Sequence, residues 1–314
     1  MRYTRRMRGQ HNRSWLVIVR AGRGSLHSRY AADDASRKYD VLVAAWQDGV
    51  APPEGPNDRL VMQPGQKIAG YHSLFERFPD LLDTYTHIAL VDDDIDMSPE
   101  AVNRSFEAGS AENLSIWQPS LTWDSYFSYA AFLRNPAFQL RYTNFVEMMC
   151  PFFRADALRK ALPLFDLGYD VGPDLVWTRL EEDNHCRAAI LDTVSVHHTR
   201  PVGKAKRART EGRFKRYDSE VQTFLDQAGL GFRGNVVYAA KTRGGRALAG
   251  RGQIAFRYMA LMAGLVRTPM VKWKFLRLVS DAIRHVLIRP KSLDPIDAQS
   301  VAQTVRMAQA APSL

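Results

Sequence analysis

The stretch THIALVDDDID, residues 86–96, joins a short apolar run to four aspartates in five positions. The apolar run predicts a buried β-strand, with the acids at its carboxyl end. Like charges this close repel one another, so the stretch is either a solvated acidic turn before a helix or a site that needs a cation. Side chains alternate along a strand, so Asp92 and Asp94 would point to one side and Asp93 to the other.

Strands and helices are predicted to alternate along the chain around this stretch. Apolar runs predict further strands at residues 14–22, 38–46, 114–120 and 186–198, and a strand leading into a helix at 144–155. Helical spacing and helix-start signals predict helices at residues 32–38, 67–85 with a reset at Pro79, 98–109 with Ser98 as N-cap, 154–162 and 175–183. This alternation predicts an α/β fold, a mostly parallel sheet flanked by helices.

The composition is that of a folded protein. A chain of 314 residues with 46% hydrophobic and 11% aromatic residues can form one large or two small domains with a core. Its two cysteines, Cys150 and Cys186, form no disulfide framework or metal-type spacing, so we expect reduced thiols. The apolar run behind the basic N-terminus has five residues, too short for a signal-peptide core or a bilayer span. We therefore expect a cytoplasmic protein.

The charge is divided unevenly along the chain. Residues 14–203 hold 17 Lys/Arg and 26 Asp/Glu, a net of −9, whereas residues 204–289 hold 19 and 5, a net of +14. This contrast predicts an acidic domain at 14–203 and a basic, mainly helical region at 204–314. Residues 254–289 would form amphipathic helices. The basic region could lie on an anionic membrane surface, pack on the acidic domain or a protein partner, or, least favoured, bind nucleic acid.

Two further segments carry candidate functional side chains. His197 and His198 end the last predicted strand, where at most one of them would face the aspartates; a histidine there can also be structural. Asp170 and Asp174 stand in a loop rich in Gly and Pro, which could direct a carboxylate into a cleft as a general base. Either could instead be a turn residue or the N-cap of the helix predicted at 175–183.

The order of seven short motifs resembles the domain of unknown function 707 family, a group similar to glycosyltransferases of the GT-A fold. The motifs span residues 19–203 and read VRAGRGSLH, PGQKIAGYH, VDDDI, WQPSLT, FVEMMCPFF, GPDLVW and VSVHHTRPVG. The resemblance implies a nucleotide-sugar site over the first strands and a Mn²⁺ or Mg²⁺ ion held by an acidic D-x-D motif. The chain departs from the plant relatives in lacking an N-terminal membrane anchor and in having the basic C-terminal region, so localisation and acceptor do not carry over.

Carried over residue by residue, the resemblance assigns these roles. The metal ligands would be Asp92, Asp94 and one of His197 and His198. The catalytic base would be Asp174, and Glu147 and Gln118 also match motif positions. The nucleotide-sugar site would comprise Arg20, Gly22, Lys67, Asp92 and Asp93. From the residues alone, Arg20 and Lys67 are either phosphate contacts or solvated surface cations.

These observations lead to one main hypothesis and one alternative. The main hypothesis is a metal-dependent glycosyltransferase that moves a sugar from a nucleotide-sugar donor to a glycan or lipid-linked acceptor in cell-surface polysaccharide assembly. It would be cytoplasmic and peripheral at the inner membrane face. The alternative is a non-catalytic module that binds a sugar nucleotide or glycan and recruits partners or membrane through its basic C-terminus.

Overall fold

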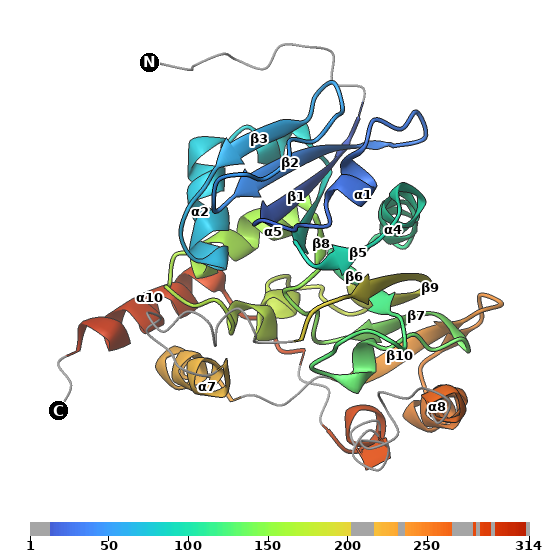
Figure 1. The fold of residues 1–314 in the computed structure, drawn as a ribbon. Helices are drawn as coiled ribbons and strands as arrows, with labels where there is room; N and C mark the ends of the chain where they lie inside the picture. The colour runs from blue at the N-terminus through green and yellow to red at the C-terminus, as the bar shows by residue number, and fades with distance from the viewer. Residues whose placement is uncertain are drawn as a thin grey trace, which may run out of the picture.

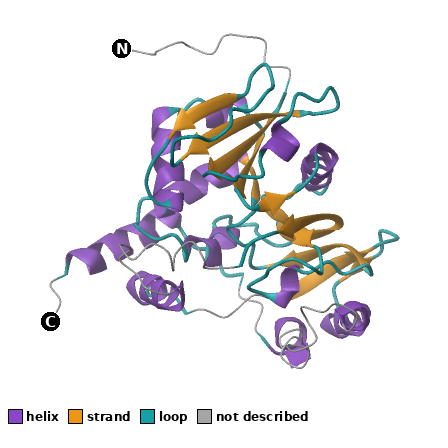
Figure 2. Cartoon of the chain, viewed as in Figure 1, coloured by secondary structure: helices purple, strands orange, loops and turns teal. Residues whose placement is uncertain are grey.

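The computed structural model describes residues 13–201, 217–231, 236–265, 279–280, 283–289 and 293–311. Within these residues one 11-stranded sheet runs through the molecule, with helices around it (Figures 1 and 2). The strand order is β11-β10-β7-β9-β6-β8-β4-β1-β2-β3, and β5 pairs separately with β9. The strands are β1 Trp15–Ala21, β2 Tyr39–Ala45, β3 Arg59–Met62, β4 His87–Asp92, β5 Ile95–Asp96, β6 Ile116–Leu121, β7 Phe138–Thr143, β8 Phe152–Arg154, β9 Ala188–His198, β10 Val237–Thr242 and β11 Ala247–Leu248.

The sheet is mixed in direction, so the α/β prediction is confirmed but the expectation of mostly parallel strands was inexact. Strands β3, β2, β1 and β4 are parallel neighbours, and β6 is parallel to β9. Strand β8 enters between β4 and β6 antiparallel to both, while β7 is antiparallel to β9 and β10. Strand direction depends on how connecting segments return, and the period of apolar residues does not record it.

The helices follow the predicted order with two exceptions. They are α1 Ser28–Ala31, α2 Lys67–Arg77, α3 Leu81–Thr84, α4 Pro99–Ala111, α5 Ala155–Ala161, α7 Tyr217–Ala228, α8 Arg251–Leu265 and α10 Ala298–Ala310, with short turns η1 Ala130–Phe132, η2 Leu162–Leu164, η3 Pro173–Leu175, η4 Trp177–Arg179 and the π-helix η6 Arg284–Ile288. The predicted cap is confirmed: Ser98 Oγ accepts from the Ala101 N–H at 3.3 Å. The helix expected at 32–38 lies earlier, at α1, and that expected at 175–183 is only the turns η3 and η4.

Helices α4 and α2 cover opposite faces of the first strands. On β1, the Trp15 ring stacks on Phe106 of α4 at 5.1 Å between centroids. Arg20 has the opposite parity on the strand and lies beneath α2, where a Cβ on Gly70 would fall 2.6 Å from its Cζ. The sheet between the two helices is therefore buried on both faces, which explains the uninterrupted apolar runs of β1, β2 and β4.

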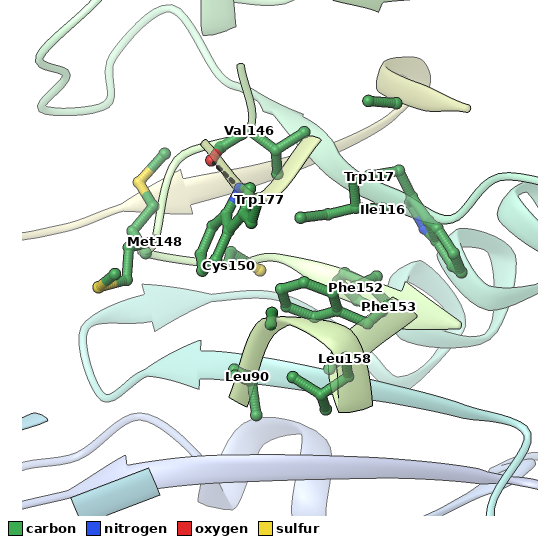
Figure 3. Packing of buried hydrophobic residues seen from close by; sticks show 14 of the residues in the cluster. Leu90, Ile116, Trp117, Val146, Met148, Cys150, Phe152, Phe153, Leu158 and Trp177 are labelled. Atoms are coloured by element: carbon green, nitrogen blue, oxygen red, sulfur yellow. Dashed lines mark hydrogen bonds between the residues drawn. The ribbon is translucent and has the colours of Figure 1, made fainter. Parts of the chain in front are cut away.

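An aromatic core lies under the loop that connects β7 to β8. Figure 3 shows Phe152, Phe153 and Trp177 packed with the neighbouring apolar side chains. The Trp177 indole N–H donates to the Val146 carbonyl at 3.0 Å, which fixes the backbone of this loop (Figure 3). The residue after Val146 is Glu147, so the core determines where that carboxylate stands.

The C-terminal residues add to the same sheet and pack on its helices. Strand β10 pairs with β7, and α8 packs on β10, while α10 contacts α7 and η2. The start of the predicted basic region and most of the second predicted amphipathic helix lie outside the described residues. No helix in the described part of the chain is both long and apolar enough to cross a bilayer.

Candidate functional site

The acidic run follows β4 directly, as predicted, and its aspartates have different partners. Asp92 ends the strand, and its Oδ1 lies 2.5 Å from the ammonium of Lys67, the first residue of α2. Lys67 also donates to the Met148 carbonyl at 2.8 Å. Burial raises the pKa of Asp92 to about 6; repulsion from Asp94 adds to this effect, and Lys67 opposes it. Lys67 is thus the counterion of Asp92 and not a solvated surface cation.

Asp93 ties together two loops around the site. Its Oδ2 accepts from the Gly22 N–H at 2.8 Å, and its Oδ1 accepts from Arg200 at 3.1 Å. Arg200 also donates to the Gly24 carbonyl at 2.6 Å, so the loop after β1 and the end of β9 are held together. Asp96 instead pairs with the exposed Arg29. These contacts give Asp93 and Asp96 orienting roles.

Asp94 faces His198, which lies 104 positions later at the end of β9. The two backbones are adjacent because β5 pairs with β9 and the Thr199 N–H donates to the Asp94 carbonyl at 3.1 Å. Asp94 Oδ2 lies 3.4 Å from His198 Nε2. Burial opposes charge on both groups, but their mutual interaction outweighs it, lowering the pKa of Asp94 and raising that of His198.

The hydrogen bonds of His198 decide what the pair can hold. Its Nδ1 lies 2.8 Å from the Tyr126 carbonyl, which can only accept, so Nδ1 carries a hydrogen. In the neutral ring, Nε2 then presents a lone pair to the Asp94 carboxylate, and only a proton or a cation between them makes that contact favourable. Asp94 Oδ1 is buried without a hydrogen-bond partner among the described residues. A carboxylate and an imidazole at this separation suit two ligands of one divalent ion.

The remaining predicted metal ligands stand apart from this pair. His197 is opposite Asp96 in the β5–β9 ladder, and its side chain points to the other face from His198. The Asp92 carboxylate forms an ion pair with Lys67. Accordingly, the described residues contain no group of three His, Cys, Asp or Glu side chains placed to hold a metal ion. The protein side of a cation site here would be Asp94 and His198.

Arg20 and Gly22 support the loops of the site from below. Arg20 is 4% exposed, so it is not the solvated surface cation of the alternative hypothesis. It donates to the carbonyls of Gln63 and Gly65 in the loop before Lys67. A Cβ on Gly22 would lie 2.2 Å from Cζ2 of Trp46, so the backbone reaches Asp93 only without a side chain there. Both residues therefore fix the positions of Asp93 and Lys67.

Glu147 carries the second unpartnered carboxylate oxygen of the site. Its backbone N–H donates to Gln118 Oε1 at 2.6 Å. Two side-chain atoms of this pair, Gln118 Nε2 and Glu147 Oε2, are buried without hydrogen-bond partners in the described residues. Burial raises the pKa of Glu147 to about 7, and the neighbouring Asp174 contributes to the increase. Buried polar atoms are normally paired, so these atoms mark a place where a polar ligand would complete the hydrogen bonding.

Asp174 lies in the turn η3 and is tied to the backbone. Its Oδ1 accepts from the Gly172 N–H at 3.0 Å, and Gly172 has a φ of +120° that only glycine adopts readily. Burial raises the pKa of Asp174 to about 6, while backbone hydrogen bonds from Gly172 and Met148 and the charge of Lys67 oppose the shift. Asp170, from the same loop, accepts from the Ile68 N–H at 3.3 Å, at the start of α2.

Lys67 links these groups into one site. Its charge acts on Asp92, Asp94, Glu147 and Asp174, which come from three different segments of the chain. Arg200 was not among the predicted residues, although an arginine two positions after a candidate ligand histidine was a usable signal. Gln118 was noted only as a motif match. Its pairing with Glu147 could not be predicted, because it depends on the β7–β8 loop passing over β6.

Comparisons with known proteins give limited information. No protein-family model matches the chain, and no curated protein matches it, so the family resemblance stays a prediction. Among solved structures, TarS 1-349 of S. aureus in complex with UDP-GlcNAc has a TM-score of 0.44 and 9% identity, covering 94% of this chain and 91% of that one. A nucleotide-diphospho-sugar transferase structure from Desulfovibrio desulfuricans G20 has a TM-score of 0.31 and 11% identity, covering 68% of this chain and 96% of that one. The structure of A197 from STIV has a TM-score of 0.35 and 14% identity, covering 60% of this chain and 86% of that one.

Proposed function

We propose that this protein is a metal-dependent glycosyltransferase that moves a sugar from a nucleotide-sugar donor to a glycan or lipid-linked acceptor. The observation that carries the proposal is the convergence of one lysine, four carboxylates and one histidine at the carboxyl end of β4 and the adjoining loops. Ligands of open α/β sheets bind at such strand ends. A cell-surface polysaccharide as the product is part of the proposal.

Asp94 and His198 would hold the divalent cation together with phosphate oxygens of the donor. Two protein ligands suffice for Mg²⁺ or Mn²⁺ when substrate phosphates and water complete the shell. The bound ion would neutralise the charge that develops on the leaving diphosphate. Lys67 stands at Asp92, between the aspartates and the β7–β8 loop, where its ammonium could move from the carboxylate to a phosphate oxygen.

Glu147 and Asp174 are the candidates for the catalytic base. A base must accept a proton from the acceptor hydroxyl, so it needs a free carboxylate oxygen in its deprotonated form. Asp174 uses its carboxylate to hold the Gly172 turn, whereas Glu147 Oε2 has no partner among the described residues. We therefore assign the base to Glu147 and give Asp174 the role of positioning the loop beside it.

The test is a ligand screen followed by turnover. Unfolding temperature is measured with nucleoside diphosphates and their sugars, with and without Mn²⁺, because a ligand that binds only the folded state stabilises it. We expect stabilisation by one nucleotide family that increases with Mn²⁺, and release of that nucleoside diphosphate with time. If no nucleotide shifts the transition in either condition, the donor site is wrongly assigned.

The alternative is a non-catalytic binding module. The base predicted from the sequence, Asp174, is engaged by backbone N–H groups as a structural aspartate would be, so catalysis depends on Glu147 alone. The two functions differ in the fate of the donor. A module would show Mn²⁺-dependent stabilisation with no turnover of any donor, whereas in the enzyme turnover would be seen and Glu147→Gln would abolish it.

A further inference from the structure

Exposed apolar side chains gather at one end of the molecule, away from the site. The described residues include eight large hydrophobic side chains with high exposure, and four of them lie on α8, on η6 or at the residue before η6. Phe256 is 80% exposed and Ile288 is 68% exposed, while Ile283 and Leu287 are each 46% exposed. Figure 1 shows α8 and the 283–289 segment at the end of the molecule opposite β1–β3. Isolated exposed hydrophobics are common, but this concentration needs an explanation.

The two segments that carry these side chains form one fixed unit. Arg251, at the start of α8, donates to the Val286 carbonyl and, at 2.6 Å, to the Arg289 carbonyl, which satisfies the end of η6. The inner side of the unit is packed: Ile254, Tyr258 and Val286 are buried. The Tyr258 hydroxyl accepts from Arg141 of β7 at 2.7 Å, which anchors α8 to the sheet. The exposed side chains therefore stand on segments that are packed and hydrogen-bonded on their inner side.

Arginines lie beside Phe256 and on η6. A shallow hollow of about 420 Å³ beside α8 is lined by Arg246, Leu248, Gly252, Gln253, Phe256 and Arg257. Arg284 on η6 and Arg243 in the turn between β10 and β11 are exposed. From residue 236 to residue 289 the sequence has eleven Lys and Arg and one acidic residue, Asp281. Among the described residues, none of Arg243, Arg246, Arg257 and Arg284 forms an ion pair within 4 Å.

We infer that the surface formed by Phe256, Arg246, Arg257 and the exposed face of η6 docks on an anionic lipid bilayer. Protruding apolar side chains can enter the headgroup boundary while arginines on the same unit contact lipid phosphates. A nucleic acid would match the charge but not the exposed aliphatic side chains, which lack π-faces for base stacking. An acidic protein is the other candidate occupant, and failure of the unaltered chain to bind anionic vesicles would favour it and overturn the inference. The inference stands independently of the proposed catalytic activity.

The experiment is sedimentation of the full chain with vesicles of phosphatidylcholine alone or of equal parts phosphatidylcholine and phosphatidylglycerol. We expect binding to the anionic vesicles only, weakened by salt. Phe256→Ser should lower the affinity about tenfold, because an aromatic ring contributes on this scale when it leaves water. The double variant R246Q/R257Q should lose most of the preference for anionic lipid.

Met307→Ser is the matched control. Met307 is 66% exposed on α10, which packs on α7 and η2 rather than on α8. This variant should bind vesicles as the unaltered chain does. Equal binding by all variants, equal loss in Met307→Ser, or binding to single-stranded oligonucleotides without vesicle binding would overturn the inference. Nucleotide-dependent stabilisation is measured on the same variants, so loss of membrane binding is distinguishable from loss of the donor site.

Discussion

Lys67 and Asp92 form an ion pair of 2.5 Å at the centre of the site, and they come from segments that are 25 positions apart in the sequence. Each side chain keeps about a quarter of its surface exposed, so the pair is open to a ligand. A diphosphate that displaced the carboxylate from the ammonium would free Asp92 for the hydroxyl groups of a donor. Under the proposed function, the Asp92 carboxylate would occupy the place that a phosphate oxygen of the donor takes beside Lys67.

Replacing Lys67 by methionine tests this exchange. The variant keeps the length of the side chain but loses the charge that a diphosphate would contact, so nucleoside diphosphate affinity should fall by at least about tenfold. Isothermal titration of the nucleotide identified by the ligand screen measures the change. Lys38→Met is the control, because Lys38 is exposed and pairs with Glu107 of α4 at 2.7 Å. Equal affinity in the two variants would remove Lys67 from the donor site.

The Asp94–His198 pair should carry the affinity for the divalent cation. Asp94→Asn and His198→Ala each remove one of two proposed ligands, so Mn²⁺ affinity should drop by about one to two orders of magnitude. Titration of Mn²⁺ into the protein, monitored by electron paramagnetic resonance, measures the affinity without a turnover assay. Asp96→Asn belongs to the same acidic run but pairs with Arg29, and it should leave the affinity unchanged. Unaltered Mn²⁺ binding in the Asp94 variant would reject the ligand assignment.

The sequence predicted the strand-end setting of this site but not its internal pairing. Strands β1, β2 and β4 are buried on both faces and gave continuous apolar runs, which are easy to recognise. β3 is an edge strand with mostly exposed residues, and β7 carries the buried Arg141, so neither has an apolar signature. Residues 175–183 looked helical, but Leu175, Val176 and Trp177 are buried, and φ of Val176 is −125°. There, tertiary packing of Trp177 outweighs helix propensity.

Glu147 should make folding stability depend on pH. Its pKa is about 7 in the folded protein and 4.5 ordinarily, because burial and the nearby Asp174 disfavour its charge, while Ser128, His198 and Lys67 only partly oppose them. Between these pH values the folded state binds a proton that the unfolded state has released, so the free energy of unfolding decreases as pH rises. The change amounts to about 3 kcal/mol at 1.4 kcal/mol per pH unit.

Replacing Glu147 by glutamine removes that pH dependence of the free energy of unfolding, and the direction of the resulting difference can be measured. Relative to the unaltered chain, the variant should gain stability on going from about pH 5 to about pH 8, by up to about 3 kcal/mol. Urea unfolding at the two pH values measures the gain. Glu107→Gln, on the exposed side of α4, should show no such difference. If the Glu147 variant and the unaltered chain change in parallel with pH, the buried carboxylate is not responsible.

Asp192 of β9 and Arg141 of β7 form a fully buried ion pair, and its loss should cost more than any change at the site. Arg141 Nε and Nη2 donate to the two Asp192 oxygens at 2.6 and 2.8 Å, and the remaining guanidinium hydrogens go to the Ala131 and Leu133 carbonyls and to Tyr258. Both side chains are fully buried. Asp192→Ala leaves the guanidinium without a counter-charge in the core, so the free energy of unfolding should fall by about 3–5 kcal/mol.

Two companion variants show whether that loss comes from the unpaired charge. Tyr258→Phe removes one hydrogen bond to the guanidinium and should cost about 1.5–3 kcal/mol. The double variant R141M/D192L removes both charges, and it should be more stable than Asp192→Ala although it has lost more polar contacts. Urea denaturation of the three proteins at one pH gives the comparison. A double variant no more stable than Asp192→Ala would mean that the hydrogen bonds to the backbone of residues 131–135, rather than charge compensation, hold this part of the structure together.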